Sequence, residues 1–309
     1  MTHAYTYMQS GALLALCASF CWTFAPFLFS SAVRRIGPYY SNFWRLIMAS
    51  TALWIIAASL ILLSPAATKG VTAISIGWMA VSGILGLTIG DFFYFKALTY
   101  LGPRRTLQIL TGVPIVSAVG AWIFLHEILS PFAVTGIALT VGAILAVNWF
   151  DKKEKTTAEP GGFSYMGIGL AIVGTICQGA AAVLMRQAYM SAGGLNVIVA
   201  AAIRISSAGA AIVLLALVSG KIRGAIKAVP SRHAFGRLIA GTALGPVVGM
   251  LFYVASLKFA PAGIASTMSS LSPVLIIPIS AWRYKTRLNW AAMIAMGAAI
   301  TGVVLIFHK

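Results

Sequence analysis

The sequence predicts an all-α membrane protein with ten transmembrane helices, arranged as two inverted repeats of five helices each. Three observations support this fold class. Apolar residues make up 60% of the 309 residues and charged residues only 9%, whereas a soluble domain carries about a quarter charged residues. Long uncharged runs follow one another along the chain, and one polar segment divides them into two sets of five. This composition argues against a soluble enzyme, a disordered chain and a disulfide scaffold.

Each apolar run is close to the length that a membrane-spanning helix requires. A bilayer core about 30 Å thick needs about 20 helical residues. The runs are continuously apolar rather than alternating, which favours helices over the strands of a barrel. The ten runs are 10–32, 39–63, 71–95, 106–125, 128–150, 162–186, 196–219, 237–257, 259–282 and 288–307.

The polar segment 151–162 is charged and ends in Pro-Gly-Gly, which is typical of a linker. It predicts three parts of the chain: a first repeat over residues 1–150, the linker 151–162, and a second repeat over residues 163–309. Because five helices carry the chain across the membrane an odd number of times, the two repeats would insert in opposite orientations. Inverted repeats of this kind mark many secondary transporters.

Local similarities between the halves support the repeat. The spacing of Ala97–Pro103 matches that of Ala255–Pro261, and this alignment places Tyr94 opposite Phe252. Arg45 and Arg204 both lie early in the second predicted helix of their half.

The charges predict the orientation in the membrane. Lys and Arg total 22 against 5 acids, for a net charge of +17. These cations lie between apolar runs rather than on a soluble basic face, so nucleic acid is not an expected partner. With ten spans, sixteen cations fall on one side of the membrane, and only Lys69, Arg186, Lys258 and Lys309 on the other. The positive-inside rule then predicts extracytoplasmic termini in the inner cell membrane.

A polar stripe recurs in both halves. Ser266, Ser269 and Ser270 are spaced so that they share one helix face. Gln108 and Thr111 hold corresponding positions in the first half. Since polar groups that face lipid without partners cost free energy, we expect the stripe to line a water-filled cavity and bind substrate. Close packing between helices is the alternative.

Three ionisable residues within apolar runs are the strongest candidates for a site. Arg45 and Arg204 each cost about 3 kcal/mol at the centre of a membrane helix, and a buried arginine is suited to a substrate carboxylate or phosphate. Arg45 could instead extend to the interface. Asp91 could carry a coupling proton, or it could pair permanently with Arg45 or Lys96.

Further candidates are aromatic or amide side chains. Trp22 and Tyr94 could stack against a substrate ring, and Gln178 stands opposite Trp22 in the second half. Glu127, at a helix end, is expected to be structural. Cys17, Cys21 and Cys177 lie in apolar runs without the neighbours of a metal site, so no metal, cofactor or catalytic residue is expected.

The run from Gly90 to Gly142 contains Ala97-Leu98-Thr99-Tyr100-Leu101-Gly102-Pro103, then Pro114, then Leu125-His126-Glu127. Together with Trp22 late in the first helix, this order resembles the drug/metabolite transporter superfamily, specifically proteins with two EamA-type repeats. The resemblance covers about residues 10–307. Departures from the pattern are His126, which stands before Glu127 in place of glycine, and Thr286, which stands in place of a glutamate.

This resemblance implies a ten-helix bundle around a central cavity that exports small metabolites, amino acids or drugs. It also implies cytoplasmic termini, in conflict with the charge distribution. We therefore expect a secondary transporter that exports a small polar metabolite, such as an amino acid, by alternating access. Its partners would be this substrate and the lipid bilayer, with the proton as a candidate coupling ion. The alternatives are an exporter of drugs or cationic compounds, a channel and an intramembrane enzyme. The sequence does not define the oligomeric state.

Overall fold

A computed structural model describes residues 2–150, 164–228, 232–276 and 290–308, and all regular structure in these ranges is helical. Before the linker lie α1 (Thr2–Leu63), η1 (Pro65–Thr68), α2 (Ala73–Gly83), η2 (Ile84–Gly90), α3 (Asp91–Leu110), α4 (Val113–Leu125) and α5 (Pro131–Phe150). After it lie α6 (Tyr165–Ser191), α7 (Val197–Val218), α8 (Ile222–Lys227), α9 (Arg232–Thr242), η4 (Ala243–Gly249), α10 (Met250–Phe259), α11 (Ala262–Ser269) and α13 (Trp290–Ile306). The predicted linker lies outside the described residues.

Within the described residues, seven helical segments are long and apolar enough to cross a membrane. They are Thr6–Ala25, Tyr39–Leu63, Ala73–Gly102, Arg105–Leu125, Tyr165–Ser191, Val197–Val218 and Ala234–Phe259. Three shorter apolar helices cover Pro131–Ala146, Ala262–Ile276 and Met293–Ile306. The prediction of an all-helical, multi-pass membrane protein is thus confirmed for the part of the chain that the structure describes.

Two glycines separate spans that would otherwise form single long helices. Gly37 interrupts α1 with a φ of 80°, and Gly102 interrupts α3 with a φ of 76°. Glycine adopts a positive φ without the steric cost that a side chain brings. Each is followed in the sequence by a proline, a residue well suited to start the next helix. The predicted spans at 39–63 and 106–125 begin just after these two breaks.

Two π-helical segments occupy equivalent places in the two halves. Both η2 and η4 contain seven residues, and the second lies 159 positions after the first (84 to 243, and 90 to 249). The same shift pairs Arg45 with Arg204 and Tyr94 with Tyr253. The sequence alignment, which paired Tyr94 with Phe252, is therefore one residue away from the structural register.

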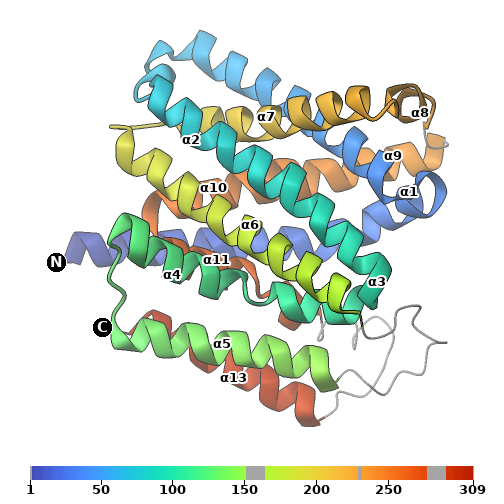
Figure 1. Ribbon diagram of the computed structural model, residues 1–309. Helices are drawn as coiled ribbons and strands as arrows, with labels where there is room; N and C mark the ends of the chain where they lie inside the picture. The colour runs from blue at the N-terminus through green and yellow to red at the C-terminus, as the bar shows by residue number, and fades with distance from the viewer. Residues whose placement is uncertain (1, 151–163, 229–231, 277–289, 309) are drawn as a thin grey trace.

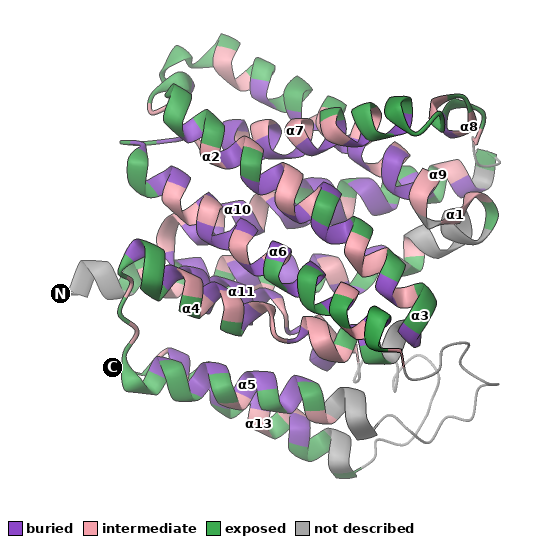
Figure 2. Cartoon of the chain, viewed as in Figure 1, coloured by how far each residue is buried: buried purple, intermediate pink, exposed green. Residues whose placement is uncertain are grey.

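The two halves interdigitate. Helix α6, the first of the second half, packs against α2, α3 and α4 of the first half. In the same way α1 packs against α7, α9, η4 and α10. Helices α5 and α13 pair with one another beside the main bundle (Figure 1). Figure 2 shows exposed residues along outer helices such as α2 and α5, and mainly buried residues on α10 and α11. This arrangement brings residues of both halves together at the centre.

Candidate functional site

A cavity of about 320 Å³ lies between helices of both halves. Pockets that bind small molecules typically measure about 300–1,000 Å³, so this cavity is suited to a small ligand. Its walls come from α1, η2, α3, α6, α7, η4 and α10. The lining residues are Trp22, Ala25, Arg45, Leu46, Leu87, Asp91, Gln178, Arg204, Ile205, Gly245, Pro246, Met250 and Tyr253.

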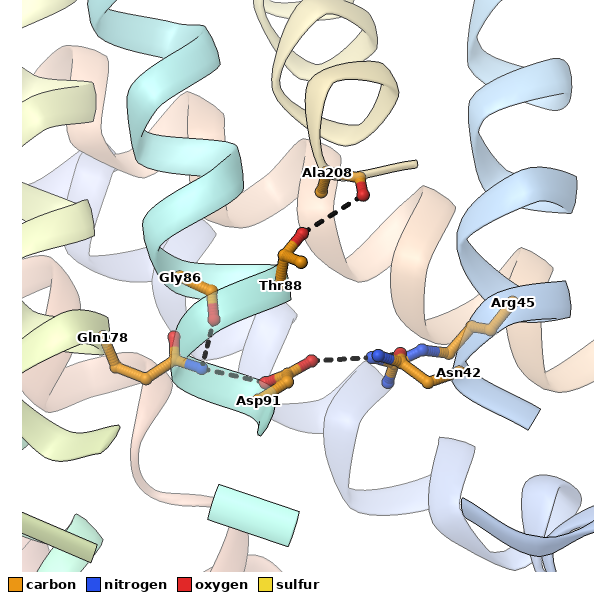
Figure 3. A network of polar contacts seen from close by, with 7 residues as sticks. All are labelled: Asn42, Arg45, Gly86, Thr88, Asp91, Gln178 and Ala208. Atoms are coloured by element: carbon orange, nitrogen blue, oxygen red, sulfur yellow. Dashed lines mark hydrogen bonds and ion pairs between the residues drawn. The ribbon is translucent and has the colours of Figure 1, made fainter. Parts of the chain in front are cut away.

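Asp91 links two other lining residues through its two carboxylate oxygens (Figure 3). Its Oδ2 accepts a hydrogen bond from Arg45 Nη2 at 3.0 Å, and its Oδ1 accepts one from Gln178 Nε2, also at 3.0 Å. Gln178 Nε2 also donates a hydrogen bond to the carbonyl oxygen of Gly86, at 3.1 Å. Arg45 Nη2 donates to Asn42 Oδ1 at 2.5 Å. Asp91 thus joins α1 to α6.

The carbonyl oxygen that Gln178 contacts belongs to a π-helical segment, where it also accepts the backbone N–H of Asp91. Gly86 lies within η2, where the hydrogen-bond pattern departs from that of an α-helix. Thr88, in the same segment, donates from Oγ1 to the carbonyl oxygen of Ala208 at 3.1 Å and so attaches η2 to α7 (Figure 3). Single π-helical turns are often found at functional sites.

Arg204 contributes a second guanidinium, and among the described residues this one forms no ion pair with an acid. The residue is only 2% exposed. Its Nη1 donates to Ser82 Oγ at 2.7 Å, while its buried Nε makes no hydrogen bond. The two acids in the described part of the chain, Asp91 and Glu127, pair with Arg45 and Arg186 instead. The cavity wall therefore carries two guanidinium groups and one carboxylate.

The three charged lining residues, Arg45, Asp91 and Arg204, differ in their exposure to solvent. As whole residues, Asp91 is 9% exposed and Arg204 2%, whereas Arg45 is half-buried. Arg45 lies eight residues after the break inside α1 at Gly37, and Arg204 is the eighth residue of α7. Arg204 is thus the most buried of the three charged lining residues.

Two aromatic rings form an apolar part of the wall. The Trp22 and Tyr253 ring centroids are 5.2 Å apart with an interplanar angle of 61°, an edge-to-face geometry that aromatic pairs favour. The hydroxyl group of Tyr253 lies 3.3 Å from Ser266 Oγ, which donates to Ser117 Oγ at 2.9 Å. Ser266, which does not line the cavity, therefore holds the Tyr253 hydroxyl group in place.

The serine stripe lies at helix contacts and does not line this cavity. Ser266 is fully buried between Tyr253 and Ser117. The hydroxyl groups of Ser269 and Ser270 both donate to the carbonyl oxygen of Ser266, at 3.0 and 2.8 Å. Hydroxyl groups that bond back to their own helix need no water, which is why this stripe packs in the interior where we expected cavity lining.

The corresponding positions of the first half behave in the same way. Thr111 Oγ1 donates to the carbonyl oxygen of Gln108 at 2.6 Å, and neither residue lines the cavity. Tyr94 also lies outside the lining, with its ring centroid 5.2 Å from that of Phe95.

Five of the eleven predicted site residues thus line the cavity: Trp22, Arg45, Asp91, Gln178 and Arg204. Sequence analysis did not select Pro246, Met250 and Tyr253, which also line it. The proline flanked by nearby glycines in η4 was an available signal for this region. The part that each of these residues takes in binding stays a prediction.

A second polar network ties the helices at the end that holds both termini. Glu127 Oε1 pairs with Arg186 Nε at 2.6 Å, and Glu127 Oε2 accepts from the backbone amide of Ala262 at 3.0 Å. Arg186 Nη1 donates to the carbonyl oxygens of Leu257 and Lys258, both at 3.0 Å. Helix ends leave amides and carbonyls without partners, and these two side chains satisfy those of α10 and α11.

In the described ranges, no group of three or more His, Cys, Asp or Glu residues is placed to hold a metal ion. The prediction that the protein uses no metal or cofactor stays a prediction.

Comparison with known proteins shows the family. A crystal structure of a protein with 17% sequence identity shares the fold, with a TM-score of 0.74 over 96% of each chain. No curated protein matches the chain. The model of the EamA-like transporter family matches residues 9–149 and again residues 165–308. The chain therefore belongs to the EamA-like transporter family, within the drug/metabolite transporter superfamily, and is a multi-pass membrane transporter.

Proposed function

We propose that this protein is a secondary transporter that exports a small polar metabolite, such as an amino acid, by alternating access across the inner cell membrane. One observation carries the proposal: a central cavity, lined by both halves of a membrane-spanning bundle, contains Arg45, Asp91 and Arg204. Ionisable residues inside a membrane are costly and commonly mark a substrate or ion pathway.

The spans support ten transmembrane helices in two inverted repeats. The seven long helical segments and the three shorter apolar helices fall at the ten positions predicted from the sequence. The two π-helical segments at a constant shift of 159 residues add support for the repeat. An odd number of spans in each half gives the inversion.

The proposed orientation rests on the loop charges. Figure 1 shows both termini at one end of the bundle. Since sixteen of the cations are predicted at the opposite end, we place the termini outside the cytoplasm.

Alternating access is supported by a polar network at one end of the bundle. The Glu127–Arg186 ion pair and its hydrogen bonds tie together helices of both halves at the end that holds the termini. Opening that end would require this ion pair to separate while the opposite end closes. Rocking of one half against the other is the usual motion of carriers built from repeats.

The cavity does not favour the alternative of cation export. Its two arginines outnumber the single aspartate, and both oxygens of that aspartate are engaged. The Asp91 carboxylate forms an ion pair with Arg45, which is the alternative to proton coupling that the sequence raised. Proton coupling through Asp91 stays a prediction.

Counterflow in liposomes tests the function. Purified protein would be reconstituted and preloaded with unlabelled amino acids or cationic drugs, and entry of the same labelled compound would be followed. We expect transient, saturable accumulation of one or more amino acids and none of the cations. Flux that neither saturates nor responds to internal substrate would indicate a channel, and a protein that moves no solute would contradict the proposal.

A further inference from the structure

The two halves supply the same arginine to the cavity but not the same acid. The shift of 159 residues that relates η2 to η4 also relates Arg45 to Arg204. It relates Asp91, the first residue after η2, to Met250, the first residue after η4. All four residues line the cavity. Arg45 is paired with its acid at 3.0 Å, whereas Arg204 has a thioether at the equivalent place.

This difference leaves Arg204 as a buried positive charge that forms no ion pair with a described acid, since Asp91, the acid in the same lining, pairs with Arg45. Its one hydrogen-bond partner in the described chain is the hydroxyl group of Ser82, and its Nε is buried without a partner. A Cβ added at Gly86 would lie 3.1 Å from Arg204 Nη2. The Arg204 guanidinium therefore lies against η2, beside the cavity. Burying a charge without a counter-ion is strongly unfavourable, and an anion in the cavity would relieve that cost.

We propose that Arg204 binds the carboxylate of the transported molecule, which occupies the place of the acid that the second half lacks, so that the substrate class is an organic monoanion. The inference rests on the proposed transport function and narrows its polar metabolite to a carboxylate. Two lining arginines and one aspartate leave one positive charge, which one carboxylate neutralises. A doubly charged phosphate would exceed that charge, and a cation would add to it.

An ammonium group on the substrate finds only a shared anionic partner in this cavity. Both oxygens of Asp91, the acid in the lining, already accept hydrogen bonds from Arg45 and Gln178. An amino acid would therefore bind mainly through its carboxylate, and less tightly than a carboxylate of the same shape without an ammonium group, because the loss of water around that group would be only partly compensated.

The rest of the cavity is suited to an apolar or aromatic body. Trp22 and Tyr253 present their edge-to-face pair to it, and Leu46, Leu87 and Ile205 complete an aliphatic wall. The structure thus assigns one end of the substrate to a guanidinium and the other to apolar side chains.

Three probes of matched shape test this substrate class: phenylacetate, its α-amino derivative phenylglycine, and benzylamine, which carries only the ammonium group. Binding to the purified protein would be measured by calorimetry, and transport by counterflow. We expect phenylacetate to bind at least about tenfold more tightly than phenylglycine, and benzylamine not to bind. The inference is overturned if benzylamine binds as well as phenylacetate, or if phenylacetate does not bind.

A substitution at the asymmetric position tests the missing acid directly. Met250→Asp would give Arg204 the partner that Asp91 gives Arg45, so phenylacetate binding should fall at least about tenfold, and the melting temperature without ligand should rise by about 2 °C or more. Met250→Leu changes the shape of this lining residue without adding a charge, so any fall in phenylacetate binding should be much smaller than that of Met250→Asp, and the melting temperature should not rise. A Met250→Asp variant that binds phenylacetate as tightly as the unmodified protein would overturn the inference.

Arg204 variants keep the test decisive if Met250→Asp does not fold. Arg204→Gln should abolish phenylacetate binding and raise the melting temperature, because a buried charge without a counter-ion is removed. Arg204→Lys keeps the charge but loses the planar fork of donors, so binding should be weakened and not abolished. An Arg204→Gln variant that still binds phenylacetate, or one that melts at a lower temperature, would contradict the inference.

The two proposals fail in different ways. Binding of phenylacetate without counterflow of any compound would contradict transport and leave the anion site intact. Saturable counterflow of benzylamine would support transport and overturn the anion site.

Discussion

Gly83→Ala is expected to disrupt the protein more than any other single added methyl group near the cavity. A Cβ at Gly83 would collide with the backbone carbonyl oxygen of Arg204 and lie 2.5 Å from Ser207 Oγ. Backbone atoms cannot rotate away, so α2 and α7 would have to separate. Overpacking of this kind typically costs about 1–3 kcal/mol. We expect a lower melting temperature and, since the neighbouring Ser82 orients Arg204, at least about tenfold weaker substrate binding.

Gly77→Ala is the matched control on the same helix. Nothing lies within 4 Å of a Cβ at Gly77, and alanine is the better helix former by about 1 kcal/mol. This variant should melt at the same temperature as the unmodified protein or slightly above it, with full binding. If Gly83→Ala behaved like Gly77→Ala in thermal melts and ligand titrations, the close contact between α2 and α7 would be wrong.

Arg186→Ala is expected to have the second large effect. The substitution removes the ion pair with Glu127 and both hydrogen bonds to the end of α10. The Glu127 side chain is only 10% exposed, so it would be left as a nearly buried charge without a cation. Breaking a buried pair from one side costs about 3–5 kcal/mol. We expect a marked fall in the melting temperature and loss of counterflow.

A double variant separates charge from packing. Glu127→Gln in the Arg186→Ala background removes the unpaired carboxylate and keeps an acceptor near the amide of Ala262. It should therefore recover part of the lost stability, since the leftover charge is the larger part of the penalty. Equal melting temperatures for the single and double variants would show that the ion pair contributes little.

Hydropathy was sufficient for the helical class and for the membrane assignment. Apolar runs report directly on what must be buried in lipid, and charge-free stretches gave the positions of spans that the structure contains. The breaks at Gly37 and Gly102 coincide with Gly-Pro pairs in the sequence. Glycine permits the positive φ at the break, and proline cannot continue the preceding helix. The rarity of acids inside the runs likewise singled out Asp91, and the cost of charge in a membrane singled out both arginines.

The sequence was less informative about which polar residues face the cavity. A serine in a membrane helix can satisfy its hydroxyl group on its own backbone, as Ser269 and Ser270 do, so a polar stripe predicts packing as readily as a binding surface. Tyr253 and Met250 were missed because their place depends on the register between the halves. An alignment that is one residue out of register hid the equivalence of Asp91 and Met250, and the two π-helical segments define it.

Protection of the cavity by substrate is the most direct test that this cavity is the transport site. A cysteine would replace Ala25, a lining residue, in a background without Cys17, Cys21 and Cys177. Alkylation by a small thiol reagent would be timed with and without phenylacetate, or an amino acid that gives counterflow. A cysteine at the exposed Ser64 is the control. We predict slower alkylation at position 25 and an unchanged rate at position 64. An unchanged rate at position 25, with a compound that is still transported, would contradict the assignment.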